Sequence, residues 1–500
     1  MNLFSLLRDA ANKAPHARAL TTDDRTIRYA DALAQTERLA SALAARGVHA
    51  GDRVGGLFAN TPEHFLAYFA AARLGAIFVP LNWRLSEGEM QNVLAHAETK
   101  ALLFEREFAP TANALQSAAG AVLAVEDLLR EDAHGAALSA PPDDDDAVAH
   151  IYYTSGTTGN PKGVMLTHGN VGTHAASAVR ELQLSSSDRW AHIAPMFHLA
   201  DAWATFAITQ VAGEHVFLPR FAPVPALDLL QRHRVTITNL VPTMLNLMVK
   251  EEGAAQRAFS LRAMLSGGAS IAPEVVKQVI ATFRCVYVQT YGMTETSPYL
   301  TLSLLDDAQK KLPPDQQLAL QCRTGRAFYG VDLRVVRDDG SPIARDDKEV
   351  GEIRVRGKTV TMGYWRNQDA TKAAFDGDGY LCTGDLATID AHGFVNIVDR
   401  KKDVIKTGAE TVFSTEVENV VYQHPAVLEC AVFGTPDPLW GEVVSVAVVP
   451  RHGMRIDVDE LIAFCRARIA HYKAPRIVRL MDALPKTGSG KIQKRKLREA

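Results

Sequence analysis

The stretch 151–170 reads IYYTSGTTGNPKGVMLTHGN, in which an apolar run of strand type enters a loop dense in Thr, Ser and Gly with one lysine, Lys162. Glycine tolerates the backbone angles that turn successive N–H groups toward phosphate oxygens, and hydroxyls and a cation add further contacts. The loop is not a Walker A loop, because no Ser or Thr follows Lys162. A flexible Gly/Ser turn is the alternative. The long uninterrupted run of Thr, Ser and Gly residues together with a lysine favours a phosphate-binding loop.

Short apolar runs and helical patterns alternate along most of the chain. The runs WAHIAPMF, EHVFLP, VTITNLVP, AMLSGGAS and CVYVQTYG each end in Gly, Pro or polar residues. They predict buried strands of an α/β domain, in which ligands bind at the carboxyl ends of the strands. Beyond about residue 325, the runs VDLRVVRDDGSPI, GEIRVRG and GFVNIVDR predict short antiparallel strands joined by tight turns.

Length and composition narrow the class of protein. The 500 residues exceed the size at which one hydrophobic core stops growing, so we expect at least two domains. A formal net charge of −3 argues against nucleic-acid binding, and the apolar stretches are too short for a signal peptide or a membrane span. Five scattered cysteines, never spaced as CxxC, argue against a disulfide framework or a zinc site. These features predict a cytoplasmic protein; a homodimer is compatible with them.

Further motifs follow the loop in the order LSGGAS (265–270), YGMTET (291–296), GYLCTGD (379–385), DRKKDVIKTGAE (399–410) and PKTGSGKI (485–492). With these motifs the chain resembles, over essentially its whole length, the adenylate-forming (AMP-binding) superfamily, and in particular its acyl-CoA synthetases. The resemblance implies an α/β fold with a large N-terminal domain of mixed sheets and helices, residues 1–401. A small mobile C-terminal α+β domain, residues 402–500, would rotate about a hinge at Lys402. The implied cofactors and co-substrates are ATP, Mg²⁺ and coenzyme A.

The resemblance also assigns roles to single residues. Thr294 would lie near the α-phosphate and the acyl carboxylate, and Glu295 would hold Mg²⁺, which prefers carboxylate oxygens. Helix capping is the alternative for Glu295. The other residues implied to bind nucleotide are Thr154, Ser155, Gly156, Thr157, Thr158, Gly159 and Lys162 in the loop, Gly267, Gly268, Ala269, Tyr291 and Gly292 at the adenine, and Asp385 and Arg400 at the ribose. Without the flanking motifs, the glycines and Asp385 would be read as turn residues and Arg400 as a surface residue.

The resemblance assigns roles to two further positions in the C-terminal domain. Lys491 matches the family's catalytic lysine, whose ammonium offsets negative charge while the carboxylate attacks the α-phosphorus. Read alone, Lys491 would be one more cation of the run KIQKRK, but the Gly-rich residues before it favour a loop that can swing into a cleft. Gly408 would line the pantetheine tunnel, and Ala409 departs there from the family's usual GGEN form.

The segment APMFHLADAW (194–203) matches the family's stretch beside the acyl pocket, with His198 near the carboxylate and Phe197 or Trp203 near the acyl chain. A lone histidine in an apolar run is more often simply packed. The predicted walls, 241–244 and 299–302, are apolar or small, and Asp201 is the one candidate counter-charge for an amino acid. We therefore predict an ATP-dependent ligase that converts a hydrophobic acid, in first place a medium- or long-chain fatty acid, to its adenylate and then to acyl-CoA. An aryl acid of the cinnamate or benzoate type is one alternative, and transfer to a carrier protein is another.

Overall fold

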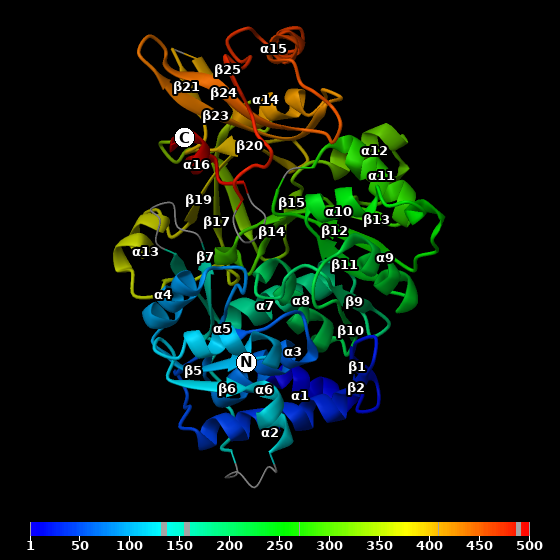
Figure 1. Ribbon diagram of the computed structural model, residues 1–500, viewed down its shortest axis with the longest axis vertical. Coiled ribbons are helices and arrows are strands. Elements are labelled where there is room, and N and C mark those ends of the chain that lie inside the picture. Colours follow the sequence, from blue (N-terminus) through cyan, green and yellow to red (C-terminus); the bar gives the residue numbers. More distant parts are fainter. Residues whose placement is uncertain are drawn as a thin grey trace. The chain divides into compact units, whose positions relative to one another are not determined.

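The computed structural model describes residues 2–131, 138–154, 161–269, 271–408, 410–486 and 492–499 (Figure 1). The chain forms two compact units, Met1–Asp332 with Val355–Leu381, and Leu333–Arg354 with Cys382–Ala500. This confirms the predicted α/β fold with a large N-terminal and a small C-terminal part. Contacts alone group the strands of 333–354 and 382–400 with the C-terminal unit. The boundary at Lys402 concerns the segment that moves as one body, and it stays a prediction.

The first unit contains a nine-stranded sheet in the order β15-β14-β13-β12-β11-β9-β10-β1-β2. Its strands are β1 (Arg18–Thr21), β2 (Thr26–Arg28), β9 (Arg189–His192), β10 (Glu214–Phe217), β11 (Ile237–Leu240), β12 (Ala263–Ser266), β13 (Val286–Gly292), β14 (Tyr299–Leu302) and β15 (Arg326–Ala327). The five apolar runs quoted above form β9 to β13, and neighbouring members of this group pair in parallel. Their carboxyl ends therefore share one edge of the sheet.

A seven-stranded sheet in the order β18-β8-β7-β4-β3-β5-β6 completes the first unit. Its strands are β3 (Arg53–Leu57), β4 (Ile77–Pro80), β5 (Thr99–Phe104), β6 (Ala121–Ala124), β7 (Val148–Thr154), β8 (Lys162–Thr167) and β18 (Gly363–Tyr364). The strands β7 and β8 are antiparallel, with Thr154 opposite Lys162. The predicted phosphate-binding loop thus connects these two strands.

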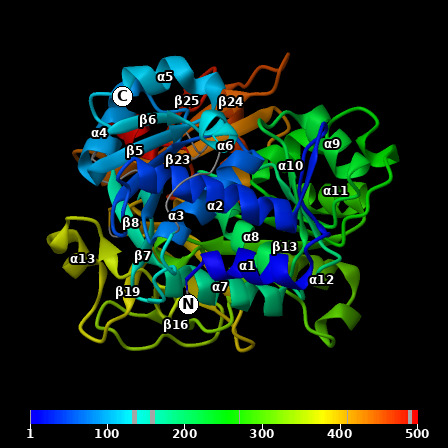
Figure 2. The ribbon, with the colours of Figure 1, turned by 90° about the horizontal axis from the view of Figure 1, so that it is seen from below.

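Helices pack on both sheets. They are α1 (Phe4–Lys13), α2 (Tyr29–Ala45), α3 (Pro62–Leu74), α4 (Glu87–Ala97), α5 (Ala109–Ala114), α6 (Val125–Arg130), α7 (His168–Glu181), α8 (Leu199–Gln210), α9 (Pro223–Arg232), α10 (Pro242–Met248), α11 (Pro273–Phe283), α12 (Pro314–Gln321) and α13 (Gln368–Ala374), with 3₁₀ turns η1 (Arg106–Phe108), η2 (Ala254–Gln256), η3 (Thr294–Thr296) and η4 (Gln309–Lys311). The helices α3 and α8 are apolar on nearly all sides and are buried along almost their whole length (Figure 2). Both belong to the main hydrophobic core of this unit.

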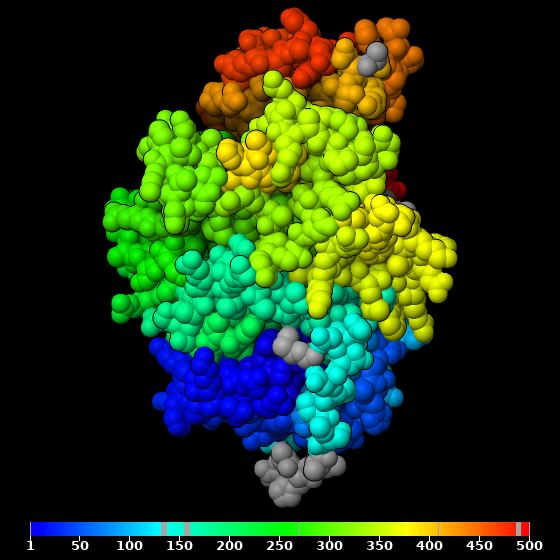
Figure 3. Space-filling model, turned by 180° about the vertical axis from the view of Figure 1, so that it is seen from behind, coloured from blue at the N-terminus to red at the C-terminus, as the bar shows by residue number. Residues whose placement is uncertain are grey.

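The N-terminal segment is tied down by a buried side chain. The amide of Asn2 donates to the carbonyl oxygens of Ala72 and Pro142 at 2.9 and 3.0 Å. The N-terminal helix (blue) and the chain around residue 142 (cyan) therefore lie side by side on the face that Figure 3 shows. Within the described ranges no helix has the length and apolar character that a membrane crossing requires. The five cysteines are all free thiols.

The second unit has two sheets of its own. The first contains β16 (Asp332–Val336), β17 (Gly351–Arg356), β19 (Leu381–Ile389) and β20 (Val395–Arg400), and the second contains β21 (Ile405–Thr407), β22 (Glu410–Val412), β23 (Val427–Asp437), β24 (Gly441–Pro450) and β25 (Ile477–Leu480). Helices α14 (Ser414–Val421), α15 (Val458–Arg466) and α16 (Lys494–Glu499) accompany them. Valines of α14, β23 and β24 form the core of this unit.

Candidate functional site

Two of the predicted nucleotide motifs meet at the carboxyl edge of the nine-stranded sheet. Gly267 to Ala269 follow β12 directly, and Tyr291 and Gly292 end the adjacent parallel strand β13. The Thr290 hydroxyl donates to the carbonyl oxygen of Ser266 at 3.1 Å, which ties the two strand ends together. The structure therefore places these residues as neighbours, as a shared adenine site requires.

The glycines at this edge are required by close backbone packing. A Cβ on Gly267 would lie 2.2 Å from the Thr290 hydroxyl oxygen, and a Cβ on Gly292 would lie 1.9 Å from the carbonyl oxygen of Pro298. Gly268 has φ +86°, in the left-handed region that glycine adopts without strain. These glycines are thus required for the local backbone conformation, as their interpretation as turn residues predicted. This conformation is compatible with an adenine site, because a surface without side chains lets a flat base approach the backbone.

A second cluster brings Lys162 and Glu295 together through Tyr364. The Lys162 ammonium lies over the Tyr364 ring, 4.9 Å from its centre, and the Tyr364 hydroxyl donates to Oε1 of Glu295 at 2.9 Å. Burial, and then the Glu295 charge, raise the pKa of Tyr364 above its ordinary value, so that the phenol stays a neutral donor. Sequence reasoning missed Tyr364, because it lies on the short edge strand β18, about 70 residues from Glu295 in the chain and outside the motifs that carry the resemblance.

The Glu295 cluster fits the Mg²⁺ ion that the family implies. Glu295 is buried in the 3₁₀ turn η3, beside the half-buried Thr294. Among the described residues there is no group of three or more His, Cys, Asp or Glu side chains that could hold a metal by themselves. Mg²⁺ commonly binds through one or two carboxylates together with substrate phosphates. One carboxylate beside the loop predicted to bind phosphate is therefore a suitable donor set.

His198 lies at the N-terminus of α8, at the end of the loop 193–198 that connects it to β9. Its Nε2 atom is buried without a hydrogen-bond partner in the described part of the chain. Burial, and then the charge of Arg84, lower the pKa of His198 to about 4, so the imidazole is neutral near pH 7. The Arg84 guanidinium lies over the rings of Trp83 and Phe197, at 5.0 and 5.7 Å from their centres. Sequence reasoning did not identify Arg84 as a cation beside the predicted acyl pocket.

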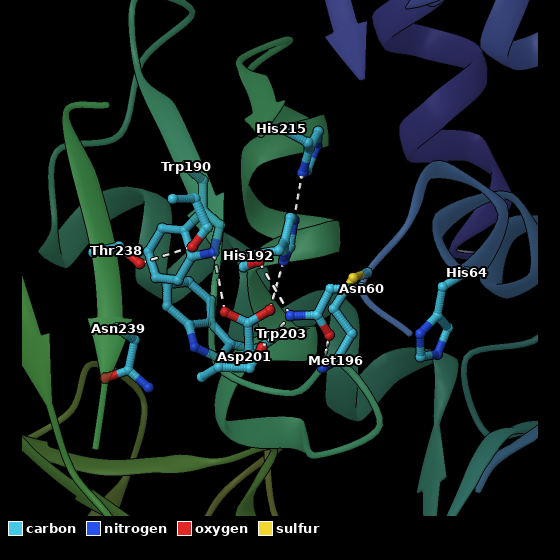
Figure 4. A network of polar contacts seen from close by, with 12 residues as sticks. Asn60, His64, Trp190, His192, Met196, Asp201, Trp203, His215, Thr238 and Asn239 are labelled. Atoms are coloured by element: carbon cyan, nitrogen blue, oxygen red, sulfur yellow. Dashed lines mark hydrogen bonds and ion pairs between the residues drawn. The ribbon is translucent and has the colours of Figure 1, made fainter. Parts of the chain in front are cut away.

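Asp201 does not supply a counter-charge to a ligand, which corrects the one candidate that the sequence offered. It is fully buried, with Oδ2 2.6 Å from Nδ1 of His192 and Oδ1 accepting from the Trp190 indole at 3.3 Å (Figure 4). The carboxyl group is therefore used inside the fold.

In the second unit, Asp385 and Arg400 face each other across the β19–β20 ladder. Nε of Arg400 lies 3.2 Å from Oδ1 of Asp385, and the carboxylate is nearly buried while the arginine side chain is 40% exposed. The pair that was predicted to bind the ribose is thus brought together. Lys402 follows on the surface.

Gly408 lies in the turn between β21 and β22, with φ +64°, and its N–H donates to the carbonyl oxygen of Trp440 at 2.6 Å. A Cβ at this position would lie 3.2 Å from the indole ring of Trp440. Ala409, Lys491 and residues 155–159 of the phosphate-loop prediction lie outside the described residues. Their assigned roles, including those of Ser155, Gly156, Thr157, Thr158 and Gly159, stay predictions.

A groove opens beside this turn within the second unit and has a volume of about 770 Å³. Its lining residues are Thr407, Glu410, Trp440, Ile462, Arg466, His471, Tyr472 and Arg476. The Arg476 guanidinium lies over the Trp440 ring at 4.6 Å. Aromatic rings and guanidinium groups together suit an anionic nucleotide, through stacking and charge-assisted hydrogen bonds. No local sequence signal pointed to this groove, since its residues come from separate segments that the topology brings together.

Comparison with known proteins identifies the family of the chain. Residues 7–365 match the AMP-binding enzyme family, and residues 416–491 match the AMP-binding enzyme C-terminal domain. The chain is similar to a feruloyl-CoA synthase from an Amycolatopsis species, with 38% identity covering 98% of this chain and 96% of that enzyme. It is also similar to a long-chain-fatty-acid–CoA ligase from Thermus thermophilus, with 36% identity covering 100% of this chain and 95% of that enzyme.

The fold is similar to that of solved acyl-CoA synthetases. The o-succinylbenzoate CoA synthetase from Bacillus subtilis, in complex with its acyl-adenylate intermediate, superposes with a TM-score of 0.89 and 31% identity. That comparison covers 99% of this chain and 98% of the other. The motifs, the fold and the full-length similarity agree, and the chain belongs to the AMP-binding enzyme family as an AMP-forming acyl-CoA ligase that uses ATP and coenzyme A.

Proposed function

We propose that the acid is hydrophobic, carries no ammonium group, and is an aryl acid of the cinnamate type. The observation that carries this proposal is a buried aromatic cluster around Trp203 and Tyr299, which lie in two segments predicted beside the acyl pocket. The rings of Trp203 and Tyr299 lie 5.1 Å apart, and those of His174 and Phe328 pack against Tyr299 at 5.4 and 5.9 Å. An aryl ring bound beside this cluster adds edge and face contacts of the same kind.

The charges around this region support an acid without an ammonium group. Asp201 is engaged with His192 and Trp190, and His198 is neutral near pH 7. An ammonium on the acid would lose its hydration without gaining a partner from these residues, at a cost of several kcal/mol. Amino acids are therefore disfavoured.

A medium- or long-chain fatty acid, our first expectation from the sequence, is the second candidate. The similarity to the long-chain-fatty-acid–CoA ligase favours it. The aromatic cluster favours the aryl acid over it, because a flexible chain loses rotational freedom on binding while a planar ring loses little. The cytoplasmic location and the homodimer stay predictions from the sequence.

The residue roles implied by the motifs are part of this proposal. Lys162 and the loop that begins at Thr154 bind the phosphates, Thr294 contacts the α-phosphate, and Glu295 holds Mg²⁺. The adenine binds against Gly267, Gly268, Ala269, Tyr291 and Gly292, and the ribose binds Asp385 and Arg400. His198 lies at the acyl carboxylate, and Lys491 supplies the cation for adenylation.

The chemistry then proceeds in two displacements. The carboxylate oxygen of the acid attacks the α-phosphorus of ATP, and pyrophosphate leaves as the P–O bond to it breaks. The thiol sulfur of coenzyme A next attacks the acyl carbonyl carbon, loses its proton, and AMP leaves. Positive groups such as Lys162 and Lys491 stabilise the charge that develops at the phosphates in the first step.

We also infer that the groove lined by Trp440 and Arg476 binds the nucleotide part of coenzyme A. Three observations support this: the groove borders the turn of Gly408, which was predicted to line the pantetheine tunnel; it carries Arg466 and Arg476; and it presents two rings on which adenine can stack.

A mass-spectrometric substrate screen tests the proposed acid. The purified protein is incubated with ATP, Mg²⁺, coenzyme A and one acid at a time, and AMP and acyl-CoA are measured together. The acids are cinnamates, benzoates, graded fatty acids, malonate and amino acids. Cinnamates should give the highest rates. A maximum among fatty acids would replace the aryl acid by the second candidate, and AMP without thioester would overturn free coenzyme A as the acceptor.

A further inference from the structure

A continuous chain of polar side chains crosses the buried core beside the loop 193–198. Oδ2 of Asp201 lies 2.6 Å from Nδ1 of His192, and Nε2 of His192 lies 3.0 Å from Nδ1 of His215. Nε2 of His215 in turn lies 3.1 Å from the Thr209 hydroxyl oxygen. All four side chains are completely buried. Figure 4 shows Asp201 between Trp190 and His192, with His215 beyond.

The hydrogen bonds fix where the protons lie in this chain. The Thr209 hydroxyl donates to the carbonyl oxygen of Thr205 at 2.6 Å, so its oxygen accepts a hydrogen bond from the Nε2–H group of His215. Burial lowers the pKa of His215 well below its ordinary value, so this imidazole is neutral and its Nδ1 is an acceptor. His192 must then donate through Nε2 to His215.

One proton is therefore left for the 2.6 Å contact between His192 and Asp201. Burial lowers the pKa of His192 to about 3 and raises that of Asp201 well above its ordinary value. Both effects disfavour an ion pair, and so the carboxyl group of Asp201 is the donor to Nδ1 of His192. Its other oxygen, Oδ1, accepts from the indole N–H of Trp190. Every donor in the chain thus points in one direction, from Asp201 through His192 and His215 to Thr209.

Both ends of the loop 193–198 adjoin residues of this hydrogen-bonded series of side chains. At its start, the carbonyl oxygen of His192 accepts from the side-chain amide of Asn60 at 3.1 Å. The same Asn60 side chain donates to Ala194 at 2.9 Å and accepts from the N–H of Met196 at 2.9 Å. At the end of the loop, the N–H of Asp201 donates to the carbonyl oxygen of His198 at 3.1 Å.

The polar pair Asp201 and His192 is better explained by the geometry that it imposes on the backbone than by a net gain in folding stability. An apolar pair of similar shape would avoid the desolvation of a buried carboxyl group and imidazole. A directional hydrogen bond, in contrast, fixes the first turn of α8 against β9 at a defined distance and angle. That constraint acts on His198 and Phe197, which precede Asp201 by three and four residues.

We propose that Asp201 and His192 are a positioning pair, which fixes the loop 193–198 and through it the placement of Phe197 and His198 at the acid. The inference rests on the proposed acid-binding role of this loop. Neither residue touches the acid; each acts through the loop backbone.

The first experiment follows the loop itself and needs no substrate. Hydrogen exchange is measured by mass spectrometry on peptides that cover residues 190–203, for the wild type, Asp201→Leu, Asp201→Asn and Thr205→Val. Asp201→Leu removes both side-chain hydrogen bonds and should speed exchange in the loop roughly tenfold. Asp201→Asn should restore protection, since its amide N–H can donate to His192 and its oxygen can accept from Trp190.

Thr205→Val is the matched control on the same helix. Thr205 is fully buried, and its hydroxyl has no hydrogen-bond partner in the described part of the chain, so the isosteric change leaves the polar chain intact. Loop exchange in this variant should equal that of the wild type. If Asp201→Leu does not fold, His192→Asn takes its place, because the shorter side chain cannot span Asp201 and His215. Unchanged exchange in the folded variant would overturn the positioning pair.

The second experiment separates the pair from the proposed acid. With the best acid of the screen, Asp201→Leu should raise the KM for the acid roughly tenfold and leave the KM for ATP unchanged, with rescue by Asp201→Asn. Equal increases for both substrates would indicate a structural defect and overturn the proposal. If every acid fails with the wild type, the proposed function fails, while the exchange experiment still decides the positioning pair.

Discussion

The residues proposed to bind substrates are held differently in the two units. In the first unit they lie at strand ends packed backbone to backbone: Gly292 has no room for a Cβ, and the carbonyl oxygen of buried Glu295 accepts from the N–H of Thr361 at 2.7 Å. In the second unit they are side chains on hairpins, and two of them are long and partly exposed: the Arg400 side chain is 40% and Trp440 is 39% exposed.

The difference indicates that the first unit mainly determines the shape of the reaction site, and that the second unit mainly determines the affinity for single substrates. A substitution at the nucleotide-binding residues of the first unit changes a surface that several groups share, so it should disturb the chemical step. One in the second unit changes a side chain that contacts a single substrate, so it should act mainly on the KM for that substrate. The predictions below start with the substitution that should break this rule.

Lys491→Ala should have the largest effect, although Lys491 belongs to the C-terminal segment. Removing a cation that stabilises the transition state should lower acid-dependent ATP–pyrophosphate exchange about 10²- to 10³-fold. Thioester formation from a supplied acyl-adenylate and coenzyme A should stay largely intact, since no pyrophosphate leaves in that step. Both half-reactions are measured on the same preparation. An equal loss in both would remove Lys491 from its catalytic role.

Glu295→Gln should come next, as a test of the rule for the first unit. The amide keeps an acceptor for the Tyr364 hydroxyl but loses the negative charge that Mg²⁺ needs, so pyrophosphate exchange should fall about 10²-fold. Exchange is measured as a function of Mg²⁺ concentration, and the half-saturating concentration should rise.

Tyr364→Phe is the matched control for that substitution. It keeps the ring under Lys162 and removes only the hydroxyl that donates to Glu295. The loss should be smaller, roughly tenfold, which is the lower end of the about 1.5–3 kcal/mol that one hydrogen bond to a charged group contributes. A Glu295→Gln variant with unaltered Mg²⁺ dependence would show that Glu295 is not the metal ligand.

The fold was predictable because its signals are local. Apolar runs bounded by Gly or Pro predicted β9 to β13, and these strands are parallel with loops at one edge. The grouping of 333–354 and 382–400 with the C-terminal unit was not predictable. It depends on strand pairing between segments far apart in the chain, for which the pattern within each strand gives no information.

The candidate site was predictable where a motif holds consecutive residues, and not elsewhere. Gly267, Tyr291 and Asp385 lie in such motifs, and the structure places each at a strand end or hairpin. Tyr364 was missed because it reaches Glu295 from a distant strand. Asp201 was left as the one candidate counter-charge for an amino acid, since a sequence does not tell whether a side chain in the first turn of a helix points inward.

Asp385→Asn should give a moderate effect that is confined to one substrate. A carboxylate accepting from two ribose hydroxyls makes charge-assisted hydrogen bonds worth about 1.5–3 kcal/mol, so the KM for ATP should rise roughly tenfold or more. The KM for coenzyme A should not change. The control is Asp338→Asn, an exposed carboxylate of the same unit that pairs with Lys401 at 2.9 Å. If the control raises the KM for ATP as much, the effect reflects lost charge and not ribose binding.

Trp440→Ala should have the smallest effect and tests the coenzyme A groove. Loss of a stacking ring should raise the KM for coenzyme A roughly 3- to 10-fold. Pyrophosphate exchange, which needs no coenzyme A, should be unchanged. Leu439→Ala is the matched control, because Leu439 precedes Trp440 in the same turn, is 79% exposed and does not line the groove. The exposed ring is expected to act on one substrate only. A fall in pyrophosphate exchange with Trp440→Ala would therefore contradict the rule that side chains of the second unit act mainly on the KM for a single substrate.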